Sequence, residues 1–426
     1  MSVRAEFHAL RDRGREIAAP ILVDIGTSSL TGIRVIARPS LAVQWVGHPV
    51  METLPLNGMD CTALGSDCVR TGLLFDRPHV VDDTFVDPFG IEWLVVDGTP
   101  TPSRHPLEHA TLAEIARYSR PVWPSRIQIP EPDVDDLVLV ADAPCPGLLD
   151  MCFGLRNSWV CLDDMTSNWR SISALLDWSL ETIVSAYEHL LSHLPRQPDV
   201  LIYGDDLGFQ QSMFVSEIDF RNFVRPRMRT LFSRLRKLTP AALCFHSCGA
   251  IRPIVRDICD LGIDIFNFDG AARGMVSGEI RRDIPREIII HGSNDLIALG
   301  RSVQSQNMAS VAILATEIAD CAPVIAAPMD NISVAEDIEA ARIGAEFLRH
   351  LTPDDVSDLA RLGPVRSILE HAVARANEAL VPDLAGKRPA SIDLTGCPSD
   401  DPTVTPFPAP LLAVSRTEKS KTRRKA

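Results

Sequence analysis

The sequence predicts an α/β protein in which short buried strands alternate with helices. Two architectures fit that alternation, a (β/α)8 TIM barrel and, as the structural alternative, a doubly wound open sheet. Short continuous apolar runs recur along the chain, as is typical of parallel strands buried on both faces. Each run leads into a polar or Gly-containing cluster and then into a helical stretch. The length of 426 residues also suits a single α/β barrel, which routinely exceeds ~200 residues.

Seven apolar runs fit this pattern, and an eighth strand is not identified. The runs are 21–24, 137–141, 199–203, 242–245, 263–266, 287–290 and 323–327. The intervening helices can be checked against their own spacing. In 251–258 the apolar residues recur at helical intervals, with Pro253 near the start and Gly262 just past the end. The stretch 334–350 likewise carries apolar residues on one face.

Two regions depart from the pattern. Residues 41–130 hold many Pro and Gly and a hairpin at 90–96, so we expect an insertion or lid over one barrel mouth. From 381 to 426 Pro, Asp, Ser and Thr dominate, which predicts a disordered tail. The predicted organisation is therefore one barrel domain, 1–380, followed by that tail.

Composition and charge indicate which kinds of molecule the protein binds. The net charge of -14 argues against nucleic acid, because phosphate binding requires concentrated positive potential. The first 17 residues read as a charged amphipathic helix without the apolar core of a signal peptide, and no run approaches the ~20 apolar residues of a membrane span. The 10 cysteines form no CxxC pair, which favours reduced thiols. We expect a cytoplasmic protein that acts on a small molecule, not on nucleic acid or a membrane.

The polar clusters that follow the predicted strands are the candidate functional residues, because parallel barrels place their active sites at the C-terminal ends of the strands. Any single Asp there has an even chance of being a helix cap. Several carboxylates at one mouth exceed what capping needs and suggest a cation, a metal or proton transfer. We predict catalytic roles for Asp24, Asp205 and Asp206. The predicted substrate-binding residues are Asp150, Gln210, Asn267, Asp269 and Asp295.

His246 and Cys248 are two residues apart at the end of a predicted strand. In an extended chain both side chains point the same way, which suits joint ligation of a metal. Zinc takes His nitrogen and Cys sulfur readily, and catalytic zinc sites keep one position open. An HxC pair alone is more often a structural feature than a metal site. Here the pair stands at a strand end followed by Gly249 and a helix, which makes the metal site and the structural role about equally well founded.

Four segments together resemble the uroporphyrinogen decarboxylase superfamily. The stretch 246–267, beginning His-Ser-Cys-Gly, is similar to its HSCG segment, and 204–210, beginning Gly-Asp-Asp, to its GDDLGxQ segment. Residues 105–118 resemble its HPL…ATL connector, and 147–156 its GLFE…LRG segment. The resemblance spans roughly residues 15–350. It implies the TIM barrel rather than the open sheet.

The resemblance implies two chemistries. One branch of the superfamily decarboxylates uroporphyrinogen without a cofactor, using a basic N-terminal segment that has no close match here. The other moves methyl groups between a corrinoid protein and a thiol or folate, and its thiol-using members bind zinc through an HxC pair and a later Cys. His246 and Cys248 match the pair, but Asp330 stands where the later Cys is expected, and Cys321 precedes that strand. The predicted zinc ligands are therefore His246, Cys248 and Asp330.

Three hypotheses follow. The first is a methyltransferase with zinc at the barrel mouth, served by a corrinoid on a separate protein because the chain has no DxHxxG segment. The second is a metal-independent carboxy-lyase, in which the carboxylates bind a cationic or N–H-rich substrate. The third is a barrel that binds a small molecule or partner without catalysis. Dense polar strand ends argue against the third, and the HxC match favours the first.

Overall fold

The computed structural model describes the greater part of the chain: residues 3–13, 22–23, 45–46, 66–75, 81–96, 99–127, 136–292, 295–328 and 335–386. Its centre is an eight-stranded sheet in which every neighbouring pair is parallel. In chain order the strands are β1 (Leu22–Val23), β3 (Cys68–Thr71), β8 (Val138–Ala141), β9 (Val200–Gly204), β10 (Ala242–Ser247), β11 (Ile265–Phe268), β12 (Ile289–His291) and β13 (Val324–Ala326).

The strand order identifies the sheet as a barrel. From β3 to β13 each strand pairs with the next one in the chain, and the first strand, β1, pairs with the last, through Leu22 opposite Ile325. A doubly wound sheet reverses its order at a switch point and leaves its first and last strands apart. The described residues show no pairing between β1 and β3. The predicted (β/α)8-barrel fold is confirmed.

All seven predicted strands are present, and the eighth is β3. It lies inside 41–130, the region predicted to be an insertion, so this part of the region belongs to the barrel itself. A buried ion pair joins β3 to the end of β8, with Arg70 Nη1 2.8 Å from Asp142 Oδ1. The run is only four residues long and contains an arginine, which explains why an apolar pattern did not reveal it.

The rest of 41–130 that the structure describes adds two small antiparallel sheets. One pairs β2 (Trp45–Val46) with β4 (Leu74–Phe75). The other is a meander of β5 (Thr84–Val86), β6 (Glu92–Val96) and β7 (Thr99–Arg104). The stretch 90–96, predicted to be a hairpin by itself, instead provides the central strand of this meander. A short helix, α3 (Leu112–Ile115), follows with a capping box between Thr111 and Glu114.

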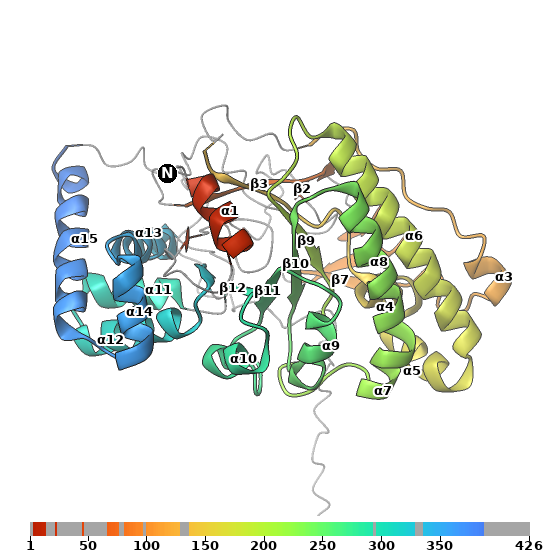
Figure 1. Ribbon diagram of the computed structural model, residues 1–426. Helices are drawn as coiled ribbons and strands as arrows, with labels where there is room; N and C mark the ends of the chain where they lie inside the picture. The colour runs from red at the N-terminus through yellow and green to blue at the C-terminus, as the bar shows by residue number, and fades with distance from the viewer. Residues whose placement is uncertain are drawn as a thin grey trace, which may run out of the picture.

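Helices surround the sheet, with α4, α5, α6 and α8 on one side of it and α11 to α15 on the other (Figure 1). Those after β8 are α4 (Leu148–Arg156), α5 (Ser158–Ser167), α6 (Trp169–His193), α7 (Glu217–Asp219), the π-helical turn Phe220–Val224, α8 (Arg225–Leu238), the 3-10 turn Arg252–Ile254, α9 (Val255–Cys259) and α10 (Ser277–Asp283). Beyond β12 come α11 (Leu296–Gln304), α12 (Met308–Asp320), α13 (Ala335–Arg349), α14 (Pro353–Leu362) and α15 (Arg366–Gly386).

The barrel interior is filled by small aliphatic side chains that alternate along the strands with residues facing the helices. They form one buried cluster: Cys68, Val138, Val140, Val200, Ile202, Ala242, Cys244, Ile265, Ile289 and Ile325. Phe7 of α1 (Val3–Arg13) joins this cluster and is fully buried. Helix α1 therefore covers the N-terminal end of the barrel. It lies within the first 17 residues, which the sequence predicted to form a charged amphipathic helix.

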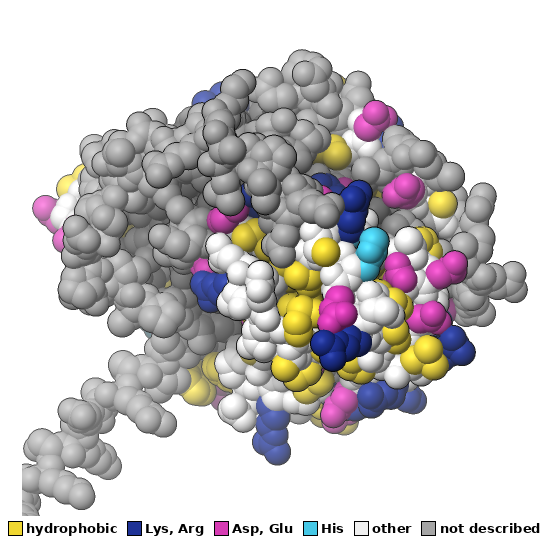
Figure 2. Space-filling model, turned by 90° about the vertical axis from the view of Figure 1, so that its left-hand side faces the viewer, with side chains coloured by type: hydrophobic (Ala, Val, Ile, Leu, Met, Phe, Trp, Pro, Cys, Tyr) yellow, Lys and Arg dark blue, Asp and Glu magenta, His cyan; other side chains and the backbone are white. Residues whose placement is uncertain are grey.

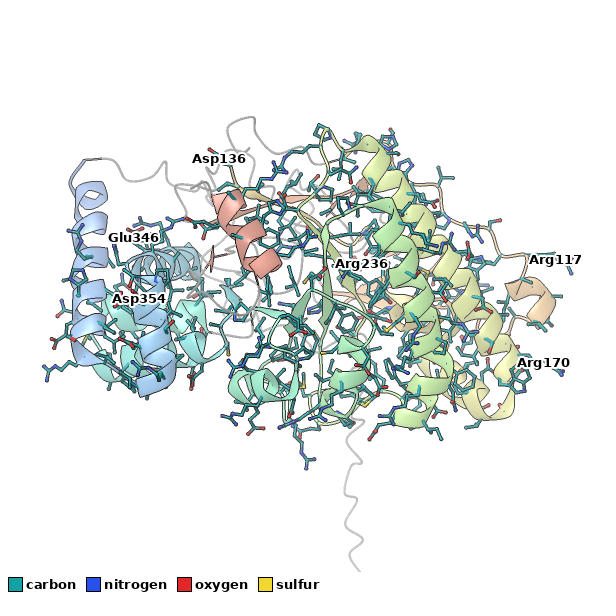
Figure 3. The ribbon with its side chains drawn as sticks, in the orientation of Figure 1. Arg117, Asp136, Arg170, Arg236, Glu346 and Asp354 are labelled. Atoms are coloured by element: carbon teal, nitrogen blue, oxygen red, sulfur yellow. The ribbon has the colours of Figure 1, made fainter. Side chains whose placement is uncertain are left out.

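Ion pairs hold α1 in this position. Arg4 and His8 both contact Asp199, the residue before β9, at 2.8 and 2.9 Å. The backbone nitrogen of Arg4 donates to the carbonyl of Asp136, which is labelled near α1 in Figure 3. Because these acidic residues precede β8 and β9, they mark the N-terminal end of the barrel. The C-terminal strand ends lie at the opposite mouth.

The last helix corrects the predicted start of the tail. Helix α15 runs to Gly386, so its final turn falls within 381–426, and 387–426 lie outside the described residues. Figure 2 shows the side formed by these last helices, where acidic and basic side chains lie together with scattered apolar ones between them. Two ion pairs of this region are Arg361 with Asp358 and Arg366 with Glu370. Among the helices that the structure describes, none has the length and apolar character of a membrane span.

Candidate metal centre

Three neighbouring strands carry polar residues at one level of the barrel, next to a glycine on a fourth. Gly204 of β9 lies opposite His246 of β10, His246 opposite Asn267 of β11, and Asn267 opposite His291 of β12. Each occupies the inward-facing position next above the apolar cluster, because side chains alternate along a strand and Ile202, Cys244, Ile265 and Ile289 lie in that cluster. The aliphatic interior is thus topped by a polar layer at the C-terminal mouth.

Asp206, His246 and Cys248 converge at this mouth, and their ligand atoms all lie within 4.8 Å of one another. His246 Nε2 is 3.5 Å from Cys248 Sγ and 3.6 Å from Asp206 Oδ1. Around tetrahedral zinc, with Zn–N at about 2.0–2.1 Å, Zn–S at about 2.3 Å and Zn–O at about 2.0–2.2 Å, neighbouring ligand atoms lie about 3.4–3.6 Å apart. The two distances from Nε2 match this spacing, so the geometry fits zinc.

The chemistry of the three donors also fits. One imidazole nitrogen, one sulfur and one carboxylate oxygen form a donor set that zinc accepts, with a fourth position left for a substrate or water. Burial, reinforced by Asp206 and Asp269, raises the pKa of the Cys248 thiol well above its usual range. A divalent cation reverses that preference and holds the sulfur as a thiolate. Of the described residues only these three form a metal-ligating group of three or more.

A second layer supports His246. Its Nδ1 is hydrogen-bonded to the side-chain oxygen of Asn267. The amide nitrogen of Asn267 donates in turn to the carbonyl of His291, at 2.8 Å. Asn267 is fully buried and His291 nearly so. His246 is therefore oriented by groups that solvent does not reach.

Asp205 points away from the candidate metal ligands, into the start of α4. Its carboxylate accepts hydrogen bonds from the backbone nitrogens of Leu149 and Asp150, at 3.0 and 3.1 Å, and from the Tyr203 hydroxyl at 3.0 Å. The helix has Gly147 as its own N-cap residue, which offers no side chain. Asp205 thus caps α4 from a neighbouring strand. Burial raises the pKa of Asp205 to about 7.

Asp150 links this cap to the candidate ligands. Its Oδ2 accepts a hydrogen bond from the backbone nitrogen of Asp206 at 3.0 Å. Oδ1 of Asp206 in turn accepts one from the backbone nitrogen of Cys248 at 2.8 Å. Burial, together with the charges of Asp206 and Asp205, raises the pKa of Asp150 well above its usual range. Asp150 therefore positions the loop that carries Asp206.

The other predicted substrate-binding residues separate into two groups. Gln210 and Asp269 meet across the rim, where the Gln210 side-chain nitrogen donates to Asp269 Oδ2, and Asp269 is close enough to Cys248 to raise the pKa of its thiol. Asp295 instead caps α11, accepting from the backbone nitrogen of Ala298 at 2.8 Å. Gln210 and Asp269 thus lie near the candidate metal ligands, where their binding role stays a prediction, whereas Asp295 caps a helix.

Asp24 and Asp330 lie outside the described residues, so their predicted roles are neither supported nor contradicted. Cys321 lies where the sequence placed it, at the end of α12 and before β13, which puts it at the mouth opposite His246. Sequence reasoning missed Asp206 as a candidate metal ligand and Asn267 as the hydrogen-bond partner of His246. The signal for the former was present in the doubled Asp205-Asp206 after β9, where one carboxylate suffices for a cap.

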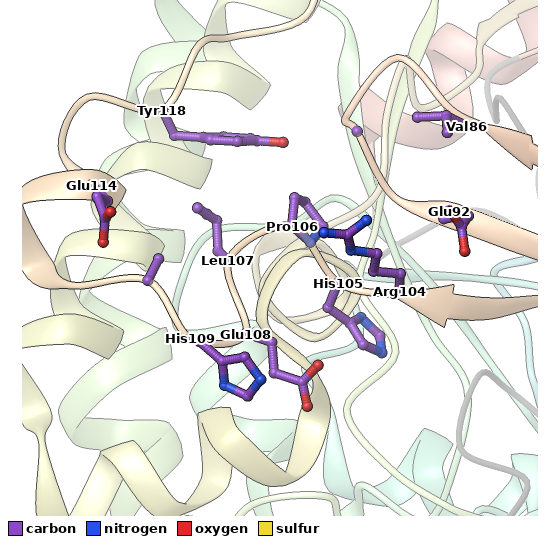
Figure 4. Close-up of a pocket in the computed structure, with 12 residues that line it drawn as sticks. Val86, Glu92, Arg104, His105, Pro106, Leu107, Glu108, His109, Glu114 and Tyr118 are labelled. Atoms are coloured by element: carbon purple, nitrogen blue, oxygen red, sulfur yellow. The ribbon is translucent and has the colours of Figure 1, made fainter.

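A cavity of about 760 Å³ lies elsewhere, between the β5–β7 meander and the segment that leads to α3 (Figure 4). Arg104, His105, Glu108 and Tyr118 are among its lining residues. His105 Nδ1 is hydrogen-bonded to the carbonyl of Gly154 in α4 at 2.7 Å. None of the residues lining this cavity belongs to the candidate metal centre, so the HPL connector segment builds a separate feature.

Two comparisons with known proteins bear on this fold. Residues 156–349 match the family model of uroporphyrinogen decarboxylase (URO-D). The matched segment includes Asp206, His246 and Cys248.

Among solved structures, a methyltransferase from Methanosarcina mazei aligns with 81% of this chain and 98% of its own, at 14% sequence identity and a TM-score of 0.53. At that identity the likeness shows the fold. No curated protein matches the chain.

Proposed function

We propose that this protein is a methyltransferase in which Asp206, His246 and Cys248 hold zinc at the barrel mouth. The observation that carries the proposal is the meeting of three suitable donor atoms at the ends of β9 and β10, with His246 Nε2 at the spacing of tetrahedral zinc from the other two. The match to the uroporphyrinogen decarboxylase family model and the methyltransferase of similar fold support the reaction class. When bound, zinc supplies a Lewis acid that lowers the pKa of a coordinated thiol.

The residues around the metal define what the chain itself contributes. His246 presents Nε2 to the metal position, and its Nδ1 is hydrogen-bonded to Asn267. The carboxylate of Asp206 accepts a hydrogen bond from the backbone nitrogen of Cys248, and the backbone nitrogen of Asp206 donates one to Asp150. Gln210 and Asp269 lie at the rim, where they would contact the methyl acceptor. The described chain carries no corrinoid-binding motif, so the methyl donor in this proposal is a corrinoid on a separate protein.

A metal-independent carboxy-lyase is the second candidate, and one observation favours it. Burial raises the pKa of Asp205 to about 7 and that of Asp150 well above its usual range. Buried carboxyl groups with raised pKa values are suited to proton transfer near neutral pH. Against this candidate, both oxygens of Asp205 already accept hydrogen bonds from α4 and Tyr203.

The metal content of the purified protein separates the two. We expect close to one zinc per chain in protein prepared without chelator, and its loss in His246→Ala and Cys248→Ser. His350→Ala and Cys259→Ser are matched controls, since His350 pairs with Glu346 on α13 and Cys259 is buried in α9. Wild-type protein that binds no zinc on titration near neutral pH would refute the methyltransferase proposal and leave the lyase as the leading function.

A further inference from the structure

We infer that Asn267 is a positioning residue that selects the tautomer of His246 in which Nε2 faces the candidate ligands. The inference rests on the proposed zinc site, because its consequence is for metal binding. Its basis is a directed chain of hydrogen bonds from His291 through Asn267 to His246.

The direction of the Asn267 amide follows from the backbone of His291. A carbonyl oxygen only accepts hydrogen bonds, so the group of Asn267 that lies 2.8 Å from the His291 carbonyl must be the NH₂ group. The same NH₂ group lies 2.9 Å from His291 Nδ1, a second possible acceptor. The amide oxygen is therefore the atom that faces His246.

The tautomer of His246 follows from the amide. An amide oxygen only accepts, so Nδ1 of His246 carries the proton and donates it to Asn267 Oδ1. A neutral imidazole protonated at Nδ1 has its lone pair on Nε2. That is the nitrogen 3.5 Å from Cys248 Sγ and 3.6 Å from Asp206 Oδ1, so the lone pair lies where a metal would take it.

Asp206 makes this selection necessary. A carboxylate near Nε2 favours the opposite tautomer, with a proton on Nε2 that points at Asp206 Oδ1, and such a proton blocks ligation. In that tautomer the Asn267 oxygen would face the lone pair of Nδ1 in a fully buried position, which is unfavourable. Asn267 thus opposes the effect of Asp206 before metal binds.

Zinc affinity of two Asn267 variants tests the inference. Asn267→Leu removes the acceptor, and we expect about 10–100-fold weaker zinc binding, the usual effect of losing an outer-shell partner. Asn267→Asp keeps an oxygen that accepts from Nδ1, so we expect affinity near that of the wild type. Asn307→Ala, which removes an N-cap of α12 far along the chain, is the control and should leave zinc affinity unchanged.

Stability distinguishes positioning from a structural role. Asn267→Asp cannot donate to the His291 carbonyl and places a carboxylate against it, so its melting temperature should fall at least as far as that of Asn267→Leu. If Asn267 were only structural, zinc affinity would follow stability, and Asn267→Asp would be no better a binder than Asn267→Leu. Equal affinity of the wild type and Asn267→Leu would equally overturn the inference.

A second measurement is independent of metal. In metal-free protein with ¹⁵N-labelled histidine, the His246 resonances, assigned by their loss in His246→Ala, should report a proton on Nδ1. In Asn267→Leu the proton should shift toward Nε2. A proton on Nε2 in the wild type would overturn the inference even if zinc binds. Failure of the wild type to bind zinc refutes the proposed function instead, and the tautomer still decides the role of Asn267.

Discussion

Oδ1 of Asp206 accepts a hydrogen bond from the backbone nitrogen of Cys248 at 2.8 Å. The loop after β9 is thereby tied to the end of β10, and a carboxylate is held beside the His246–Cys248 pair before any cation arrives. Such preorganisation is what a metal site requires of its surroundings. It also makes Asp206 a candidate ligand beside the predicted His246 and Cys248.

Asp206 and Asp330 can be compared directly. Asp206→Asn keeps an oxygen for the Cys248 backbone but lacks the charge, so we expect zinc affinity to fall by at least about tenfold, since loss of even an outer-shell partner costs about that much. Asp330→Asn should leave zinc affinity unchanged. Competition with a chromophoric chelator measures both. The reverse result would restore Asp330 as the third ligand.

Gly147 controls how closely α4 approaches β9. A Cβ at this position would lie 2.3 Å from the Gly204 carbonyl oxygen and 2.4 Å from Asp205 Cβ. Gly147→Ala must therefore push α4 away from its cap, and we expect a loss of about 1–3 kcal/mol in the free energy of unfolding, as for other overpacked sites. Urea denaturation measures it.

Gly278 in α10 is the matched control. A Cβ added there would lie 3.9 Å from the nearest atom, which is at the end of the Arg282 side chain. Gly278→Ala should leave stability unchanged or raise it by up to about 1 kcal/mol, because alanine favours the helix. Equal effects of the two variants would show that the contact at Gly147 is easily relieved.

Asp87 predicts a pH dependence of stability. Burial raises its pKa from 3.8 to about 6, although it accepts hydrogen bonds from Trp93 and from the backbone of Phe89 and Ile91. Between about pH 4 and 6 the folded state then holds this proton more tightly than the unfolded chain, so the free energy of unfolding falls as pH rises through that window.

Urea unfolding of the wild type and Asp87→Asn at about pH 3 and about pH 7, one unit outside either edge of the window, tests this. The stability advantage of the wild type should shrink by up to about 3 kcal/mol at the higher pH, the equivalent of a shift of about two pKa units. An advantage that grows with pH would mean that the hydrogen bonds dominate and the pKa of Asp87 is lowered.

The end of α15 sets where the chain can be shortened. Leu369, Ala372 and Ala376 of this helix are buried, whereas the composition beyond it predicts disorder. Truncation after 386 should leave the melting temperature and zinc content unchanged. Truncation after 365 removes the buried helix and should lower the melting temperature by several degrees, since a loss of about 1 kcal/mol shifts it by roughly 2–4 °C in domains of about 150–250 residues. A large loss of soluble protein on the first truncation would show that the tail packs on the barrel.

Sequence alone predicted seven of the eight strands. It also predicted that the side chains of His246 and Cys248 point to the same side. Both depend on local periodicity, because a buried strand requires a continuous apolar run and alternate residues of a strand share a face. Strand β3 was not predicted, because it contains Arg70 and so lacks a continuous apolar run. Arg70 pairs with Asp142, 72 residues away, and no local pattern in the sequence shows that partner.

Only the tertiary structure shows which role each polar residue at the barrel mouth has. Asp205 and Asp206 are adjacent and chemically identical in the sequence, yet one caps α4 through Leu149 and the other faces His246. Asn267 was predicted to bind substrate, but it lies fully buried between two histidines. These roles depend on which distant donor or acceptor each side chain meets, and only the closure of the barrel brings those groups together.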